Sequence, residues 1–80
     1  MKRSENPPPR NICGSRIRTL RARAKPPITQ DDLSGRLAAL GVNIGRVGIT
    51  KIENGQRAVM DFELKAIAKA LRVELHELIP

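Results

Sequence analysis

The sequence predicts a small all-α domain, and three observations lead to that prediction. Apolar residues recur at helical spacing in successive segments of the chain. Residues that favour helix starts or ends, among them Thr29, Gly41 and Pro26, separate these segments. No segment alternates between apolar and polar residues as a half-buried strand does. We therefore expect a compact domain of five helices over residues 11–80.

Residues 1–10 are predicted to form a flexible, disordered tail. The segment is polar, basic and rich in proline, and it ends in three consecutive prolines and Arg10. It therefore offers little that a core could bury. Two interpretations stay open, a flexible basic arm on DNA and an inert start of the chain.

The first helix is expected at about residues 12–24. Its apolar stripe consists of Cys13, Ile17, Leu20 and Ala24. Asn11 can cap its start, and Pro26-Pro27 ends it because a residue before proline is disfavoured in the helical region. The other faces carry Arg16, Arg18, Arg21 and Arg23. No acidic residue lies between positions 11 and 27, so this helix is strongly basic.

The next two helices are expected at about residues 30–40 and 46–53, joined by a link that contains glycine. Thr29 caps the first of them, Gly41 ends it, and its apolar stripe is Leu33, Leu37 and Leu40. The second turns Ile49 and Ile52 inward and stops at Asn54-Gly55. Two successive helices with such a turn, in a small basic domain, form the outline of a DNA-binding helix-turn-helix.

A fourth helix is expected at about residues 62–71, with Asp61 as its cap. Its inward residues are Leu64, Ile67, Ala68 and Leu71. A last helical turn follows with Glu74 as a cap, and its apolar residues are Leu75, Leu78 and Ile79. These segments complete the five expected helices.

The charge is distributed unevenly along the chain, whose formal net charge is +7. Residues 1–27 contain eight basic residues and one acidic residue, whereas residues 28–80 contain seven of each. This asymmetry points to nucleic acid or an anionic surface as partner. The only aromatic residue is Phe62, which argues against a protein that stacks single-stranded bases.

Catalysis, metal binding and membrane insertion are not indicated by the sequence. His76 is the only histidine and is expected on the surface, and Cys13 is the only cysteine and is expected in the core. No enzyme activity, cofactor, metal or small-molecule ligand is therefore expected. No apolar run approaches the roughly 20 residues of a membrane helix, and the start lacks the apolar region of a secretory signal. A cytoplasmic protein is expected.

Four blocks occur in order along the chain. They are GSRIRTLR (14–21), ITQDDLS (28–34), ITKIENGQR (49–57) and FELKAIAKALRV (62–73). Together they resemble the Cro/cI-type (XRE, lambda-repressor-like) helix-turn-helix DNA-binding family over about residues 13–79. The resemblance implies a five-helix domain that binds double-stranded DNA and inserts residues 46–53 into the major groove as its recognition helix.

The resemblance also implies roles for individual residues. The base-facing positions are Arg46, Val47, Thr50 and Lys51. The phosphate-contacting positions are Gln30, at the start of the second helix, and Asn54 and Arg57, in the loop after the recognition helix. We add Arg16 from the basic first helix as a further phosphate contact. Arg21 is expected to pair with Glu53 and so tie the first helix to the recognition helix. The link before Ile49 is longer than the family pattern, and Ser34 replaces an alanine, so its hydroxyl needs a hydrogen-bond partner.

The sequence therefore predicts a sequence-specific DNA-binding transcriptional regulator, expected to be a repressor. Two alternatives stay open: an antitoxin that also binds its own promoter, and a protein-interaction module of this fold without DNA binding. Because members of the family often bind as dimers, a homodimer on a palindromic operator is considered, with the last helical turn and the loop before it as candidate contacts. Because the sequence ends at Pro80, no separate effector-sensing or enzymatic domain is expected.

Overall fold

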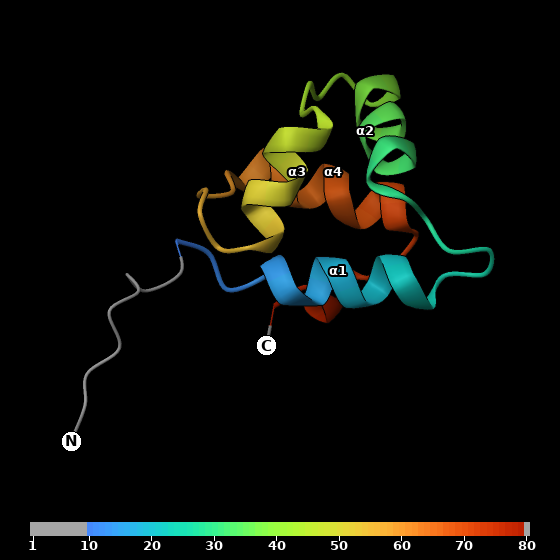
Figure 1. Ribbon diagram of the computed structural model, residues 1–80, viewed down its shortest axis with the longest axis horizontal. Coiled ribbons are helices and arrows are strands. Elements are labelled where there is room, and N and C mark those ends of the chain that lie inside the picture. The colour runs from blue at the N-terminus through green and yellow to red at the C-terminus, as the bar shows by residue number, and fades with distance from the viewer. Residues whose placement is uncertain (1–9, 80) are drawn as a thin grey trace.

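A computed structural model describes residues 10–79, and in this range the chain forms four α-helices and one short 3-10 helix (Figure 1). The elements are α1 (Gly14–Arg23), α2 (Gln30–Ala39), α3 (Arg46–Glu53), α4 (Asp61–Leu71) and η1 (Leu75–Glu77). The predicted all-α fold is confirmed, with a 3-10 turn as the fifth element. Of the predicted tail, residues 1–9 lie outside the described residues. Arg10 is described, and its backbone N–H donates to the carbonyl of Gly55 at 2.8 Å.

α1 begins two residues later than predicted, but Asn11 still serves its start. The side-chain oxygen of Asn11 accepts hydrogen bonds from the N–H groups of Gly14 at 2.8 Å and Cys13 at 3.2 Å. These two donors lie at the helix start, where backbone N–H groups lack partners within the helix. The helix ends at Arg23, and Ala24 is already extended ahead of the two prolines.

α2 starts where its sequence predicts and ends one residue earlier than predicted, at Ala39. The hydroxyl of Thr29 accepts from the N–H of Asp32 at 3.0 Å, and the Asp32 carboxylate accepts from the N–H of Thr29 at 3.1 Å. At the other end Gly41 has a φ of +82°, and the N–H of Val42 reaches back to the carbonyl of Leu37 at 2.9 Å. A glycine in this left-handed conformation satisfies the last carbonyls of the helix.

The cap of α4 differs from the prediction, whereas that of η1 falls on the predicted residue. Asp61 is the first residue of α4 rather than its cap, and the carboxylate of Glu63 accepts from the N–H of Met60 at 2.9 Å. Glu74 stands at the cap position of η1, as predicted, but its own side chain makes no capping hydrogen bond. The carboxylate of Glu77 accepts from the N–H of Glu74 at 2.8 Å. In both cases the acidic side chain reaches back from three residues further on.

The core lies between the helices and uses most of the predicted apolar stripes. α2 packs against α3 and α4, α1 packs against α3, and η1 packs against α4. The fully buried large side chains are Ile17, Leu33, Leu37, Ile49, Ile52, Ile67 and Leu78. Leu40, predicted on the apolar stripe of α2, is 45% exposed because it follows the last helical residue and turns away from the core. In the part of the chain described here, each helix is too short or too polar to cross a membrane.

The link between α2 and α3 is held by the residue that departs from the family pattern. The hydroxyl of Ser34 donates to the carbonyl of Ile44 at 2.8 Å. Val42 and Ile44 of the link are themselves buried. The hydroxyl thus has the partner that its burial requires, and the longer link is fixed to α2.

Candidate nucleic-acid interface

α3 has a buried back and an exposed front. Ile49 and Ile52 are 2% and 1% exposed and lie in the core. The outer side carries the four predicted base-facing residues Arg46, Val47, Thr50 and Lys51, which form two pairs at i and i+4. Val47 is 69% exposed and is not part of the core. The front of α3 is therefore available to a ligand.

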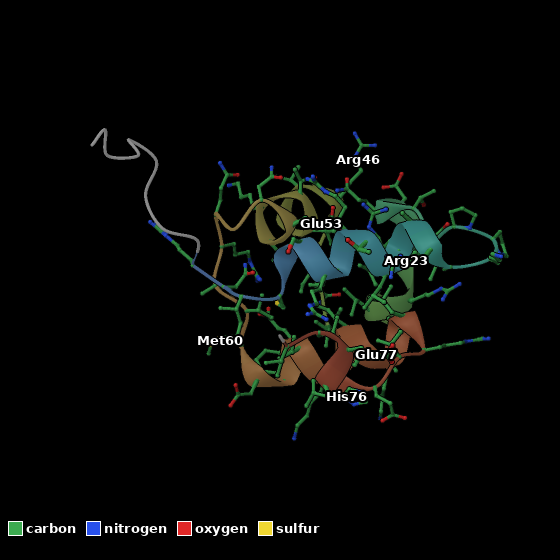
Figure 2. All side chains as sticks on the ribbon, turned by 90° about the horizontal axis from the view of Figure 1, so that it is seen from below. Arg23, Arg46, Glu53, Met60, His76 and Glu77 are labelled. Atoms are coloured by element: carbon green, nitrogen blue, oxygen red, sulfur yellow. The ribbon has the colours of Figure 1, made fainter. Side chains whose placement is uncertain are left out.

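Arg46, at the first position of α3, is only loosely held. Its guanidinium lies 3.8 Å from the carboxylate of Asp31, and the two side chains are 67% and 73% exposed. Exposed pairs of this kind contribute little to stability. Figure 2 shows Arg46 extending away from the body of the domain. The guanidinium can therefore exchange Asp31 for another partner at little cost.

Glu53, the last residue of α3, is a buried acid at the junction of three helices (Figure 2). Its carboxylate accepts from Nε of Arg21 at 2.6 Å and from Nη2 of the same residue at 2.9 Å. It also accepts from Nε2 of Gln30 at 3.1 Å. The predicted ion pair between Arg21 and Glu53 is thus confirmed, and Gln30 joins it from α2.

The charges of this pair stabilise each other. Burial alone would raise the pKa of Glu53, but the hydrogen bonds from Arg21 and Gln30 outweigh it and hold that pKa below its ordinary value. The hydrogen bonds to Glu53 raise the pKa of Arg21 in turn. Nη1 of Arg21 also donates to the carbonyl of Ile28 at 2.9 Å. Both groups are therefore ionised at neutral pH and fix α1 against α3.

The side-chain amide of Gln30 is oriented by two neighbours. Its Nε2 donates to Glu53, and its Oε1 accepts from the hydroxyl of Thr50 at 3.1 Å. A carboxylate cannot donate, so the nitrogen must face Glu53 and the oxygen must face Thr50. The amide nitrogen carries a second N–H, which can donate to an anion at the start of α2.

Arg18 lies beside the end of α3, whereas the sequence indicated only that it belongs to the basic cluster of the first helix. Its Nη2 donates to Oδ1 of Asn54 at 2.8 Å, and its Nε lies 3.6 Å from the carboxylate of Glu53. The side chain remains 59% exposed. Its position three residues before Arg21, on the same side of α1, was the available signal.

A comparison with protein families agrees with this geometry. Residues 28–78 match the model of the helix-turn-helix family HTH_3, which is of the Cro/cI (XRE) type. The chain belongs to this helix-turn-helix family. The match covers α2, α3, α4 and η1 and begins after α1. None of the curated proteins and none of the solved structures compared with the chain matches it.

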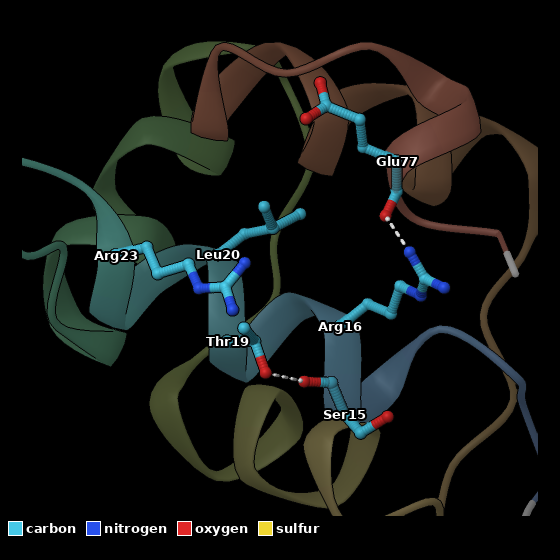
Figure 3. Close-up of a pocket in the computed structure, with 6 residues that line it drawn as sticks. All are labelled: Ser15, Arg16, Thr19, Leu20, Arg23 and Glu77. Atoms are coloured by element: carbon cyan, nitrogen blue, oxygen red, sulfur yellow. Dashed lines mark hydrogen bonds between the residues drawn. The ribbon is translucent and has the colours of Figure 1, made fainter.

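Two residues that were predicted to contact phosphate, Arg57 and Arg16, form hydrogen bonds within this helix-turn-helix domain. Arg57 donates to both carboxylate oxygens of Glu63, at 3.2 and 2.9 Å, and so joins the α3–α4 loop to the start of α4. Hydrogen bonds from Arg57 lower the pKa of the buried Glu63 despite the opposing effect of burial. Arg16 points toward η1, where its Nη1 lies 3.4 Å from the carbonyl oxygen of Glu77 (Figure 3). Both arginines are thus engaged elsewhere in the fold.

Two further residues position the helix-turn-helix, and sequence patterns did not assign them this role. The side-chain nitrogen of Asn11 donates to the carbonyls of Ile52 at 3.0 Å and Arg57 at 2.7 Å. A Cβ atom at Gly14 would collide with the backbone oxygen of Ile52. Only glycine therefore permits this close approach of α1 to the end of α3. Glycine at a helix start is common, so its contact with another helix cannot be recognised from its position alone.

Proposed function

We propose that this protein is a sequence-specific double-stranded DNA-binding regulator of transcription that represses by occupying its site. In the proposal α3 lies in the major groove, as the second helix of a helix-turn-helix does. The observation that carries it is the exposed front of α3, held in place from behind by the buried Arg21–Glu53 pair. A rigidly positioned helix with a free polar front is what base readout requires.

The four front residues are assigned to base contacts by their chemistry. Arg46 and Lys51 are long, exposed donors that suit the O6 and N7 acceptors of guanine. The exposed Val47 suits the methyl group of thymine. The hydroxyl of Thr50 lies within hydrogen-bond distance of Gln30 and of the Arg46 carbonyl, which leaves its methyl group for apolar contact. We expect these residues to select the sequence.

Phosphate contacts are assigned to groups around that front. Gln30 offers its second amide N–H at the start of α2, and Asn54 offers its amide nitrogen, because its oxygen is bound by Arg18. Arg18 itself adds an exposed positive charge on the same side. Such contacts set the register of the protein on the duplex, whereas base contacts specify the sequence.

Selection of bound duplexes from a random pool tests the proposal. We expect enrichment of one motif, and a palindromic motif would support binding as a two-fold dimer. For about six phosphate contacts, affinity should fall about a thousandfold between 50 and 200 mM salt. A pool that yields no motif, or binding that salt does not weaken, would contradict the proposal.

The candidate contact for such a dimer is smaller than the sequence suggested. Leu75 and Ile79 are 37% and 39% exposed, but Leu78 is fully buried in the core. Leu78 therefore cannot contribute to a surface, and the last helical turn offers two apolar side chains rather than three.

A further inference from the structure

An apolar hollow lies between the end of α2 and the outer side of α4. We call it the α2–α4 hollow. The lining residues used below are Leu40, Val42, Phe62, Lys65, Ala66 and Lys69. The four from α4 occupy positions i, i+3, i+4 and i+7 and therefore share one side of that helix. The hollow is thus formed by two packed helices rather than by a loop.

Two large apolar residues of the hollow, Leu40 and Phe62, are exposed. Phe62 is the only aromatic residue of the chain, yet 61% of it is exposed. Leu40 is 45% exposed. The inner side of α4 already fills the core with Ile67 and Leu71. Phe62 is therefore not needed for packing, and an exposed apolar cluster of this kind is typical of an interaction site.

The charge of the hollow narrows the choice of partner. Lys65 and Lys69 are exposed at its edge, and none of the described residues that line it is acidic. A two-fold contact between copies of the chain would place this patch against itself and bring the lysines of both copies together. The net charge of +7 adds further repulsion between copies. Acidic residues beside an apolar stripe complement the hollow better than a second copy does.

α4, which forms one wall of the hollow, lies away from the proposed DNA-binding surface. In Figure 2, Arg46 extends from one side of the domain, whereas α4 and Met60 lie toward the opposite side. A partner at α4 would therefore leave the front of α3 free. Binding at the hollow does not depend on the proposed function, and the two can be tested separately.

We propose that the α2–α4 hollow binds an acidic amphipathic helix of a partner protein. Phe62 and Leu40 bury against the apolar stripe of that helix, and Lys65 and Lys69 pair with acidic residues at its edge. Helices in apolar grooves are recognised through residues at i, i+3, i+4 and i+7, so the contact has a defined pattern.

Peptide titration of the full chain tests this proposal. The probe is a fluorescent synthetic peptide with leucines at i, i+3, i+4 and i+7 and glutamates at the flanking positions. The control is a scrambled peptide of the same composition, which has the same charge but no apolar stripe. We expect the patterned peptide to bind at least about tenfold more tightly than the scrambled one. Amide chemical shifts should change at residues 40–42 and 60–69.

Two pairs of variants decide where the peptide binds. Phe62→Ser should weaken binding by about tenfold or more, and because Phe62 is exposed its loss leaves no cavity in the core. The double change Lys65→Glu and Lys69→Glu should do the same. The matched control is the double change Arg16→Glu and Arg23→Glu on α1, which alters the net charge of the protein by the same amount. It should weaken peptide binding much less.

Several results would overturn the proposal. Equal binding of the two peptides, or equal losses in the two double variants, would mean attraction to overall charge alone. Chemical shifts centred on α1 or α3 would place the peptide elsewhere. Self-association of the chain that Phe62→Ser abolishes would assign the hollow to a second copy. If the hollow variants still bind DNA like the wild type while losing the peptide, the two surfaces are independent.

Discussion

The guanidinium of Arg21 in α1 donates two hydrogen bonds to the carboxylate of Glu53, the last residue of α3, at 2.6 and 2.9 Å. The Glu53 side chain is fully buried, and that of Arg21 is 15% exposed. The pair therefore sets the position of the proposed recognition helix. The pair lies behind α3 and does not involve the residues on the front of that helix.

Removing the charge of Glu53 should destabilise the fold strongly. In Glu53→Gln the buried Arg21 loses its counter-ion, and a broken buried pair costs about 3 kcal/mol or more. Urea unfolding followed by circular dichroism measures the change. Asp31→Asn, which removes the exposed partner of Arg46, is the control and should have a much smaller effect. Similar losses of unfolding free energy in the two variants would show that the Arg21–Glu53 pair stabilises the fold no more than the exposed Arg46–Asp31 pair does.

The contribution of Glu53 should depend on pH. Its pKa is lower in the folded state than in the unfolded chain, so its stabilising effect is present above the unfolded pKa and is lost as pH falls through the folded pKa. The difference in unfolding free energy between the wild type and Glu53→Gln should therefore be large at neutral pH and shrink below about pH 4. A difference that stays constant on acidification would argue against an ionised Glu53.

Gly14→Ala should destabilise the protein although alanine favours helices. The added Cβ collides with the backbone of Ile52, which cannot move without displacing α3 from α1. We expect a cost of about 1–3 kcal/mol, typical of overpacking. Gly35→Ala is the matched control, because no atom other than those of its chain neighbours and its own helix backbone lies within 4 Å of the Cβ position. It should raise the free energy of unfolding by about 0.5–1 kcal/mol. Thermal unfolding of both variants reports the sign of each effect.

Lys51→Ala and Gln30→Ala should separate base readout from phosphate contact. Without Lys51, affinity for the selected duplex should fall by about tenfold while affinity for random duplex changes little. Gln30→Ala should weaken both duplexes alike. Fluorescence anisotropy with the two duplexes measures the ratio. Equal losses for Lys51→Ala would exclude it from sequence readout.

Arg57→Gln should lower stability and leave the salt dependence of DNA binding unchanged. The guanidinium of Arg57 is bound by Glu63, whose buried carboxylate also accepts from the backbone of Met60. If Arg57 contacted a phosphate instead, the slope of affinity against salt would fall by about 0.9. Binding measured at a series of salt concentrations distinguishes the two roles.

Local pattern predicted much of this fold. α3 has the predicted bounds, and α2 ends one residue before the predicted bound, because the capping of Thr29, the glycine at position 41 and the apolar spacing act over a few residues. The errors lie at the ends of helices. Asp61 was expected to cap α4, but Glu63 reaches back to do so. Leu40 continues an apolar stripe, yet the helix ends before the stripe reaches the core.

The sequence by itself determined the helices and, through a family resemblance, the Arg21–Glu53 pair. Only the tertiary structure decided which arginines have partners. Arg16, Arg18 and Arg57 have the same chemistry, but they lie beside Glu77, Asn54 and Glu63 respectively. The reason is physical: helical period and capping are set by neighbours in sequence, whereas a long charged side chain pairs with whatever group the packing of distant segments brings near it.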